Sequence, residues 1–205
     1  NVALGDEAGH DITTGSRNVI VGSKAGDAAT TTDDTTLVGY GAGGGAIMTG
    51  HDNVAIGANA LAAATSGASN VVIGKDAGLA ISTGANNVAI GFEALKTEDG
   101  NGDNTAVGYQ ALKTLNAGAD AFNTAIGYQS GLALTTGTNN TAVGKGSMSA
   151  MTVGGTNTAV GLSALSDDTK GSKSTGVGYQ ALSSQNFTSA TDSHNTAVGY
   201  NAGSL

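Results

Sequence analysis

The sequence predicts an all-β fold, a parallel β-solenoid of twelve coils with about seventeen residues each. The first observation is a repeat that runs through the whole chain, Asn-(Val/Thr)-Ala-(Ile/Val)-Gly-x-x-Ala-(Gly/Leu). The second is the glycine in this motif, which suits a turn that needs positive φ or close backbone approach. The third is the β-branched or small character of the residues before that glycine, which is typical of a strand. A short unit stacked many times builds a solenoid.

We number the positions of each coil from its asparagine, so that the motif glycine is position five. This glycine recurs every 17 to 21 residues, at Gly5, Gly22, Gly39, Gly57, Gly74, Gly91, Gly108, Gly127, Gly144, Gly161, Gly178 and Gly199. Stacked coils place like residues above one another at about 4.8 Å per coil, so twelve coils predict a rod about 58 Å long. Asparagine side chains can bond to each other along such a stack. We expect this ladder at position one, which includes Asn53, Asn70, Asn87 and Asn104.

Positions two to four are expected to form the strand of each coil. Side chains alternate along a strand, so positions two and four share one face and position three points to the other. Position four is always a large aliphatic residue, and we expect it to form a buried ladder inside the coil; this ladder includes Ile56, Ile73, Ile90, Val107, Ile126 and Val143. A second short strand over positions nine to thirteen is expected to return the chain to the next coil. The segments lack the 3.6-residue apolar period of a helix.

Composition narrows the classes of function. The chain contains 34 glycines and no cysteine, proline or tryptophan, and alanine supplies much of its apolar content. Few large side chains are available for burial, so the fold needs dense backbone pairing or a partner chain. A net charge of −8 argues against nucleic acid as a partner. The sequence has no run of 18 apolar residues, so it does not predict a helix that spans a membrane. Because both ends fall inside a repeat, we expect one repeat domain over 1–205, part of a longer fibre.

The motif resembles two families of repeat protein. Asn-Val-Ala-Ile-Gly at 53–57 and 87–91 resembles the repeat of trimeric autotransporter adhesin heads. Asn-Thr-Ala-Val-Gly-Tyr-Gln-Ala-Leu at 104–112 is similar to repeats of phage tail-fibre proteins. The resemblance covers the whole chain and implies a left-handed β-roll, three chains around one axis, and a fibre that reaches for a surface. Adhesin heads use about fourteen residues per coil, so the seventeen-residue coil departs from that pattern.

Aromatic residues gather at position six. All five tyrosines lie there, and Phe92 precedes two of them in consecutive coils; these residues are Tyr40, Phe92, Tyr109, Tyr128, Tyr179 and Tyr200. One interpretation is a strip that contacts a cell-surface glycan, with Phe92, Tyr109, Tyr128, Tyr179 and Tyr200 as the contact residues. The other is that the rings pack on one another beside the turn. The second is the commoner reason for such a row, and glycan contact is kept as the alternative.

The sequence gives only weak indications of a metal site, a catalytic site or an ice-binding surface. Acidic residues cluster in the second turn of the coil, near position fifteen, as Asp33–Asp34, as Glu98–Asp99 with Asp103, and as Asp167–Asp168. Calcium could bind there, but solvated turn charge is the expected role. No catalytic triad or paired carboxylates stand out, and we expect neither an enzyme nor a cofactor. Threonines at position two, from Thr105 to Thr196, would suit an ice-binding plane, but we expect them to be buried beside the position-four ladder. The sequence thus predicts an extracellular fibre, on a virion or a cell surface, whose partner is itself, as a homotrimer or an end-to-end polymer.

Overall fold

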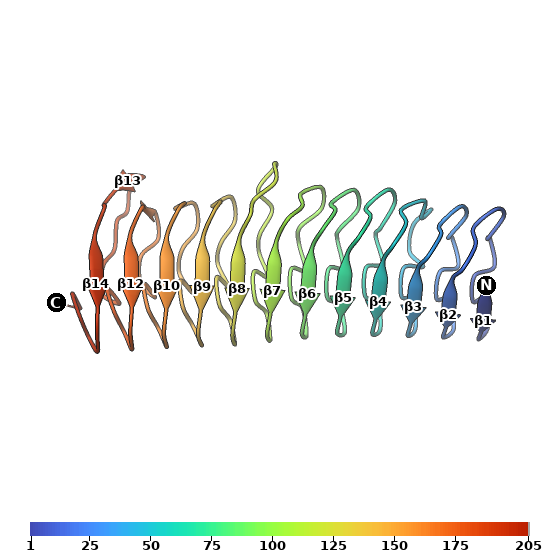
Figure 1. The fold of residues 1–205 in the computed structure, drawn as a ribbon, viewed down its shortest axis with the longest axis horizontal. Coiled ribbons are helices and arrows are strands. Elements are labelled where there is room, and N and C mark those ends of the chain that lie inside the picture. Colours follow the sequence, from blue (N-terminus) through green and yellow to red (C-terminus); the bar gives the residue numbers. More distant parts are fainter. Residues whose placement is uncertain (205) are drawn as a thin grey trace.

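The computed structural model describes residues 1–204 and shows a single β-solenoid, all-β over that range, without a helix. Figure 1 shows the coils side by side along a rod, with the N-terminus at one end and the C-terminus at the other. Twelve strands pair in sequence order into one sheet. Their bounds are β1 Val2–Leu4, β2 Val19–Val21, β3 Thr36–Val38, β4 Val54–Ile56, β5 Val71–Ile73, β6 Val88–Ile90, β7 Thr105–Val107, β8 Thr124–Ile126, β9 Thr141–Val143, β10 Thr158–Val160, β12 Thr175–Val177 and β14 Thr196–Val198. The predicted fold class is confirmed.

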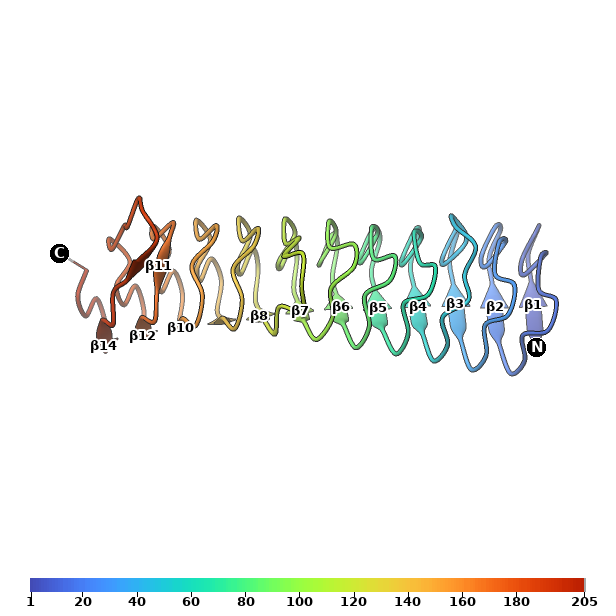
Figure 2. The same cartoon turned by 90° about the horizontal axis from the view of Figure 1, so that it is seen from above.

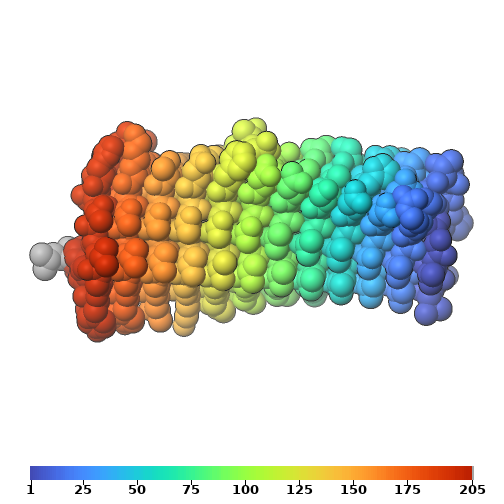
Figure 3. All heavy atoms as spheres, viewed as in Figure 1, coloured from blue at the N-terminus to red at the C-terminus, as the bar shows by residue number. Residues whose placement is uncertain are grey.

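All pairs of neighbouring strands in this sheet are parallel, and like positions lie directly opposite one another. Ile56 pairs with Ile73, and Ile73 pairs with Ile90, as the repeat predicts. Coils of 18, 19 or 21 residues keep this register because their extra residues enter the second turn. The loop between β7 and β8 therefore rises above the rod in Figures 1 and 3. Length variation is confined to one edge of the molecule.

The expected second strand over positions nine to thirteen is wrong. That segment is a series of turns, and the small second sheet contains only β11 (Gly171–Ser172) and β13 (Thr191–Asp192). Position nine, where the expected strand would begin, takes a left-handed backbone angle, with φ of 51° at Leu95. A strand needs negative φ at successive residues, so this angle excludes a strand that begins there. Figure 2 shows the resulting stack of compact loops beside the strands.

The direction of the strand side chains also differs from the expectation. Position three points into the coil and is almost completely buried, as at Ala55, Ala89 and Ala125. Position four points outward, and Ile56 and Ile126 keep 37% and 41% of their surface exposed. The ladder of Ile56, Ile73, Ile90, Val107, Ile126 and Val143 is in register but lies outside the coil, so its predicted burial there is wrong. The inner strand face is mostly alanine, but it also holds the buried side chains of Ile20 and Leu37.

The interior is completed by side chains from positions eight, nine and twelve, and their volumes compensate within each coil. Where position three is large, position nine is glycine, as in the coil that contains Leu37 and Gly43. A Cβ on Gly43 would lie 2.8 Å from a methyl carbon of Leu37. Where position three is alanine, position nine is leucine or methionine in five coils, as with Ala89 and Leu95, and glycine in three, at Gly9, Gly131 and Gly203. Large side chains at positions three and nine thus never occur in the same coil, which limits overpacking of the interior.

Candidate functional site

Stacked rings on the surface of the rod form the most regular feature outside the core. Phe92 and Tyr109 stack with centroids 5.4 Å apart and planes inclined by 13°, and Tyr109 stacks on Tyr128 at 5.0 Å and 8°. We call these three residues the aromatic row. Tyr179 and Tyr200 form a separate stacked pair, also at 5.0 Å and 8°. The sequence placed these residues correctly above one another, because the strands that precede them pair in register.

Lysines cover both ends of the aromatic row. The ammonium of Lys75 lies 6.0 Å from the ring centroid of Phe92, and that of Lys145 lies 5.7 Å from the ring centroid of Tyr128. Both lysines occupy position six of their own coils, so the ladder reads Lys-Phe-Tyr-Tyr-Lys along the rod. These ends were not predicted, although the spacing of position six in the sequence places both lysines in the ladder. Cation–π contact at such exposed sites contributes roughly 0.5–1 kcal/mol.

This stacking limits how the row could contact a ligand. Both faces of the Tyr109 ring are occupied, one by Phe92 and the other by Tyr128. A sugar that packs on an aromatic ring needs a free face, and only the edges and the hydroxyl group remain at this residue. Tyr200 differs, because it stacks with Tyr179 on one side and is 75% exposed. Glycan contact thus stays a prediction, restricted at Tyr109 to the ring edge.

A polar ladder runs beside the aromatic row at position seven. The side-chain amide of Gln129 donates to Oε1 of Gln110 at 2.9 Å, and that of Gln110 donates to Oε2 of Glu93 at 2.8 Å. Lys96 and Lys113 approach the two oxygens of the Glu93 carboxylate at 2.6 and 2.7 Å. Hydrogen bonds from Lys113, Lys96 and Gln110 lower the pKa of Glu93 to about 2. The charge of Glu93 is fully matched, so it is fixed in place and unavailable as a proton donor near neutral pH.

The predicted asparagine ladder is present and buried. Asn53, Asn70 and Asn87 have no solvent exposure. Oδ1 of Asn70 accepts from the backbone N–H of Asn87 at 2.9 Å, and Nδ2 of Asn70 donates to the carbonyl of Gly84 at 2.9 Å. The direct amide-to-amide bonds are fewer, such as that from Nδ2 of Asn104 to Oδ1 of Asn87 at 3.2 Å. Most of these asparagines therefore tie their own second turn to the next coil, which explains why the amide is needed at position one.

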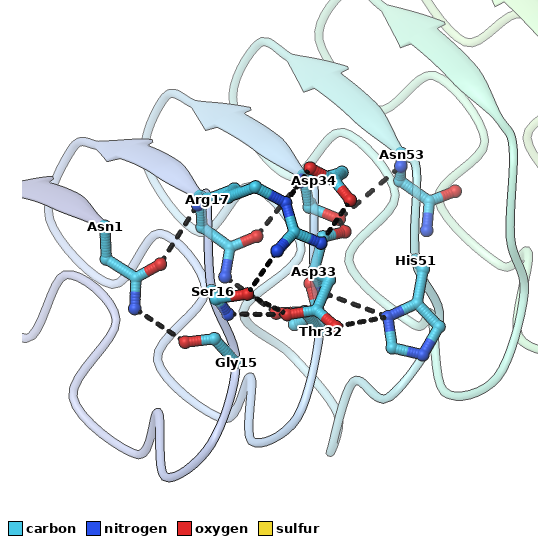
Figure 4. A network of polar contacts seen from close by, with 11 residues as sticks. Asn1, Gly15, Ser16, Arg17, Thr32, Asp33, Asp34, His51 and Asn53 are labelled. Carbon is cyan, nitrogen blue, oxygen red and sulfur yellow. Dashed lines mark hydrogen bonds and ion pairs between the residues drawn. The ribbon is translucent and has the colours of Figure 1, made fainter.

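Charged residues of the second turn pair with one another near the N-terminus, as Figure 4 shows. The guanidinium of Arg17 donates to both carboxylate oxygens of Asp34, at 2.6 and 2.7 Å. Asp33 accepts from the backbone N–H and the hydroxyl of Ser16, and the hydroxyl bond is the largest cause of its lowered pKa. The backbone N–H of Asp33 also donates to Nδ1 of His51 at 2.9 Å. These contacts use both carboxylate oxygens of Asp34 and Oδ1 of Asp33.

Two acidic residues lie inside the solenoid at position twelve, where other coils carry Ile81, Leu115 or Leu134. Glu98 has no solvent exposure; Oε1 accepts from the backbone and the amide of Asn101, whereas Oε2 has no partner. Burial raises the pKa of Glu98. Asp168 is equally buried, but it accepts from the backbone N–H of Gly171 and from Gln185. The expected role of Glu98 and Asp168 as solvated turn charge is therefore wrong, because both side chains lie in the core.

The outward side of the twelve-stranded sheet, made by positions two and four, is a continuous surface along the rod. We call it the sheet face. It carries valine, isoleucine, leucine and threonine, without one charged residue. Thr105, Thr124 and Thr141 lie on it half-buried. The threonines of position two therefore face out of the coil, and their expected burial within it is wrong. Twelve strands in register make this surface regular, as the rows of atoms along the rod in Figure 3 suggest.

Residues 1–204 contain no pocket and no cluster of three or more potential metal ligands. Over the same residues, no helix is long and apolar enough to cross a bilayer. Comparison with known protein families, with characterised proteins and with solved structures finds no match to this chain. The likeness to adhesin heads and tail fibres therefore rests on the repeat motif alone.

Proposed function

We propose that this chain is a structural segment of an extracellular fibre, in which copies of the chain associate through the sheet face and display a surface for attachment. The observation that carries the proposal is the sheet face itself, an uncharged aliphatic and threonine surface across twelve strands. Soluble monomers rarely expose continuous apolar patches above a few hundred Å², and larger ones usually mark sites of association. Residues 1–204 contain no pocket, and the rod offers extended contact along its length, which suits a mechanical role.

The size of the sheet face fits association between copies of the chain. Twelve strands spaced by about 4.8 Å, each three residues long, cover roughly 600 Å². Stable interfaces of standard size bury about 600–1,000 Å² on each partner, so the sheet face lies at the lower end of this range; obligate interfaces are apolar. Two rods that align their sheet faces would also match the spacing of their side-chain ladders along the whole contact. Three chains around an axis is the arrangement that the adhesin-like motif favours, and end-to-end polymers are the alternative.

Light scattering on the purified chain tests this proposal through its mass in solution. We expect a mass near three chains for the wild type. Ile90→Lys places a charge on the sheet face and is expected to give a mass near one chain, because a buried unpaired charge is costly. Thr136→Lys introduces the same side chain at an exposed turn position and should keep the wild-type mass.

Other masses would contradict parts of this proposal. A wild-type monomer at all concentrations would rule out association through the sheet face. Masses that grow with concentration in all three proteins would favour end-to-end polymers, in which the sheet face has no role. Circular dichroism of both variants would show that each still folds, because Ile90 lies outside the coil and its loss removes little of the core.

Contact with a cell-surface glycan is a second candidate, supported by the exposed ring edges of the aromatic row and by the neighbouring amides. Tyr109 and Tyr128 are 41% and 47% exposed. Replacing both with alanine should abolish binding on a glycan array if the row makes the contact. Gln110 and Gln129 bond to each other, so their amides are already oriented along the rod. Unchanged binding in the double variant would exclude the row as the contact.

A further inference from the structure

Two pairs of tyrosines hold their rings against each other on neighbouring coils. We propose that Tyr109–Tyr128 and Tyr179–Tyr200 are sites of oxidative cross-linking, at which a one-electron oxidant joins each pair into dityrosine. The link would connect two coils of the same chain through a covalent carbon–carbon bond. This proposal concerns a modification of the rod and does not depend on the sheet face or on the number of chains in the fibre.

The rings of each pair are already placed for coupling. Their centroids lie 5.0 Å apart and their planes differ by 8° in both pairs. The preceding strands fix this arrangement, because β7 pairs with β8 and β12 pairs with β14 in register. Two reacting groups held in such proximity behave as if at very high concentration. Coupling within a pair should therefore outrun coupling between separate molecules.

An oxidant in solution can reach these rings. The exposed fractions are 41% for Tyr109, 47% for Tyr128, 40% for Tyr179 and 75% for Tyr200. Stacking covers the ring faces of the first two and leaves their edges at the surface. The phenol hydroxyl and the adjacent ring carbons lie at the edge of a tyrosine ring. These are the atoms that lose hydrogen and form the new bond.

The reaction balances with a peroxide and a haem peroxidase as the oxidising system. Each phenol loses one electron and one proton to become a tyrosyl radical. The two radicals form one bond between the ring carbons next to the oxygens, and both carbons then lose their hydrogens as the phenols re-form. Two hydrogen atoms leave the protein per link, and one hydrogen peroxide accepts them to give two waters.

The neighbours of the Tyr109–Tyr128 pair restrict its reaction to one link. Phe92 covers the other face of Tyr109 and has no phenol to oxidise. Lys145 covers the other face of Tyr128. Tyr40 is 58% exposed, but position six of the adjacent coils carries Ser23 and Ala58, so it has no ring beside it. This tyrosine is an internal control, since it is accessible but has no partner in its own chain.

Peptide mapping after treatment with peroxidase and hydrogen peroxide tests the proposal on the full chain. Trypsin cleaves after Lys96, Lys113 and Lys145, so a Tyr109–Tyr128 link would join peptides 97–113 and 114–145. Tyr179 and Tyr200 share the peptide 174–205, and cleavage after Asp192 by an acid-specific protease separates them. We expect both linked species, a mass loss of two hydrogens for each link, and a product that stays at single-chain mass in denaturing gels.

Conservative variants provide the controls. Tyr109→Phe keeps the stack and should lose the first link only, Tyr179→Phe should lose the second only, and Tyr40→Phe should change neither. In denaturant, cross-linking should no longer favour the Tyr109–Tyr128 and Tyr179–Tyr200 pairs over other pairs of tyrosines. Links that involve Tyr40 as often as the pairs, or products that are mainly covalent dimers, would overturn the proposal. So would the absence of dityrosine when the same treatment couples free tyrosine.

Discussion

A glycine at position five sets how closely neighbouring coils can approach. At Gly108 the backbone has φ of +136°, and an added Cβ would meet the carbonyl oxygen of Gly127. The same contact repeats at most other coils, as between Gly91 and Gly108 or between Gly144 and Gly161. Two constraints therefore act on this residue. Its backbone conformation favours glycine, and a carbonyl oxygen of the next coil occupies the place that a Cβ would take. This explains why the residue is constant through twelve coils.

Gly108→Ala should destabilise the solenoid strongly. Unfavourable φ costs about 1–3 kcal/mol, and the forced separation of two coils adds about 1–3 kcal/mol as overpacking does in cores. Gly118→Ala is a matched control, because Gly118 also has positive φ, at +74°, but an added Cβ would have no atom within 4 Å. Denaturant melts should show a clearly larger loss for Gly108→Ala. Equal losses would mean that backbone strain alone selects the glycine.

Glu98 should make the stability of the rod depend on pH in an unusual direction. Its pKa is raised by burial, so the folded state holds the proton more tightly than the unfolded chain. Its contribution is therefore complete below the ordinary glutamate pKa of about 4.3 and is lost as pH rises through the folded pKa. Glu98→Gln removes this proton equilibrium. The variant should gain stability relative to the wild type as pH rises from about 4 to about 7.

Glu93→Gln provides the control of opposite sign. Lys113, Lys96 and Gln110 lower the pKa of Glu93 to about 2. The contribution of Glu93 to stability is therefore complete above the ordinary glutamate pKa and is lost as pH falls from there through about 2. Free energies of unfolding across pH would measure both variants against the wild type. If the stability of both variants relative to the wild type changes with pH in the same direction, burial does not raise the pKa of Glu98.

At the scale of the element, the coil was predictable in its period and turns but not in the direction of its strand side chains. Alternation shows that positions two and four oppose position three, and it cannot say which side is inside. Placing the larger aliphatic residue inside is a reasonable rule, but the inner space is filled by residues such as Leu95 and Ile81. A usable signal was present, since Leu37 at position three coincides with Gly43 at position nine. That compensation identifies position three as internal.

The stacked ladders were predicted better than their surroundings. In-register stacking follows from the repeat, so the asparagine ladder and the aromatic row could both be placed from the sequence. The lysines at the ends of the row follow from the same register and were overlooked. The ion network of Glu93 could not be predicted, because it joins positions seven and ten through a turn whose left-handed angles no short motif specifies.

At the scale of the whole molecule, the rod is a one-dimensional stack in which each coil contacts only its neighbours. Stability in such proteins is close to a sum of coil and interface contributions. Removing residues 70–86, one complete coil of seventeen residues, would bring Ile56 beside Ile90 and let Oδ1 of Asn53 accept from the backbone of Asn87. Every ladder of the sheet would close again in register. The rod should therefore shorten without losing its architecture.

This deletion should keep the β-type circular dichroism spectrum and a cooperative melt, and should lower the total free energy of unfolding by roughly one coil's share. Removing only residues 70–78 is the control, because it joins Ser69 to Leu79 and leaves half a coil with no strand. That variant should lose much of its β signal and aggregate or unfold at lower temperature, since the interrupted sheet exposes unpaired edges. The larger deletion should thus be the milder one. If damage instead follows the number of residues removed, the seventeen-residue coil is not the structural unit of this protein.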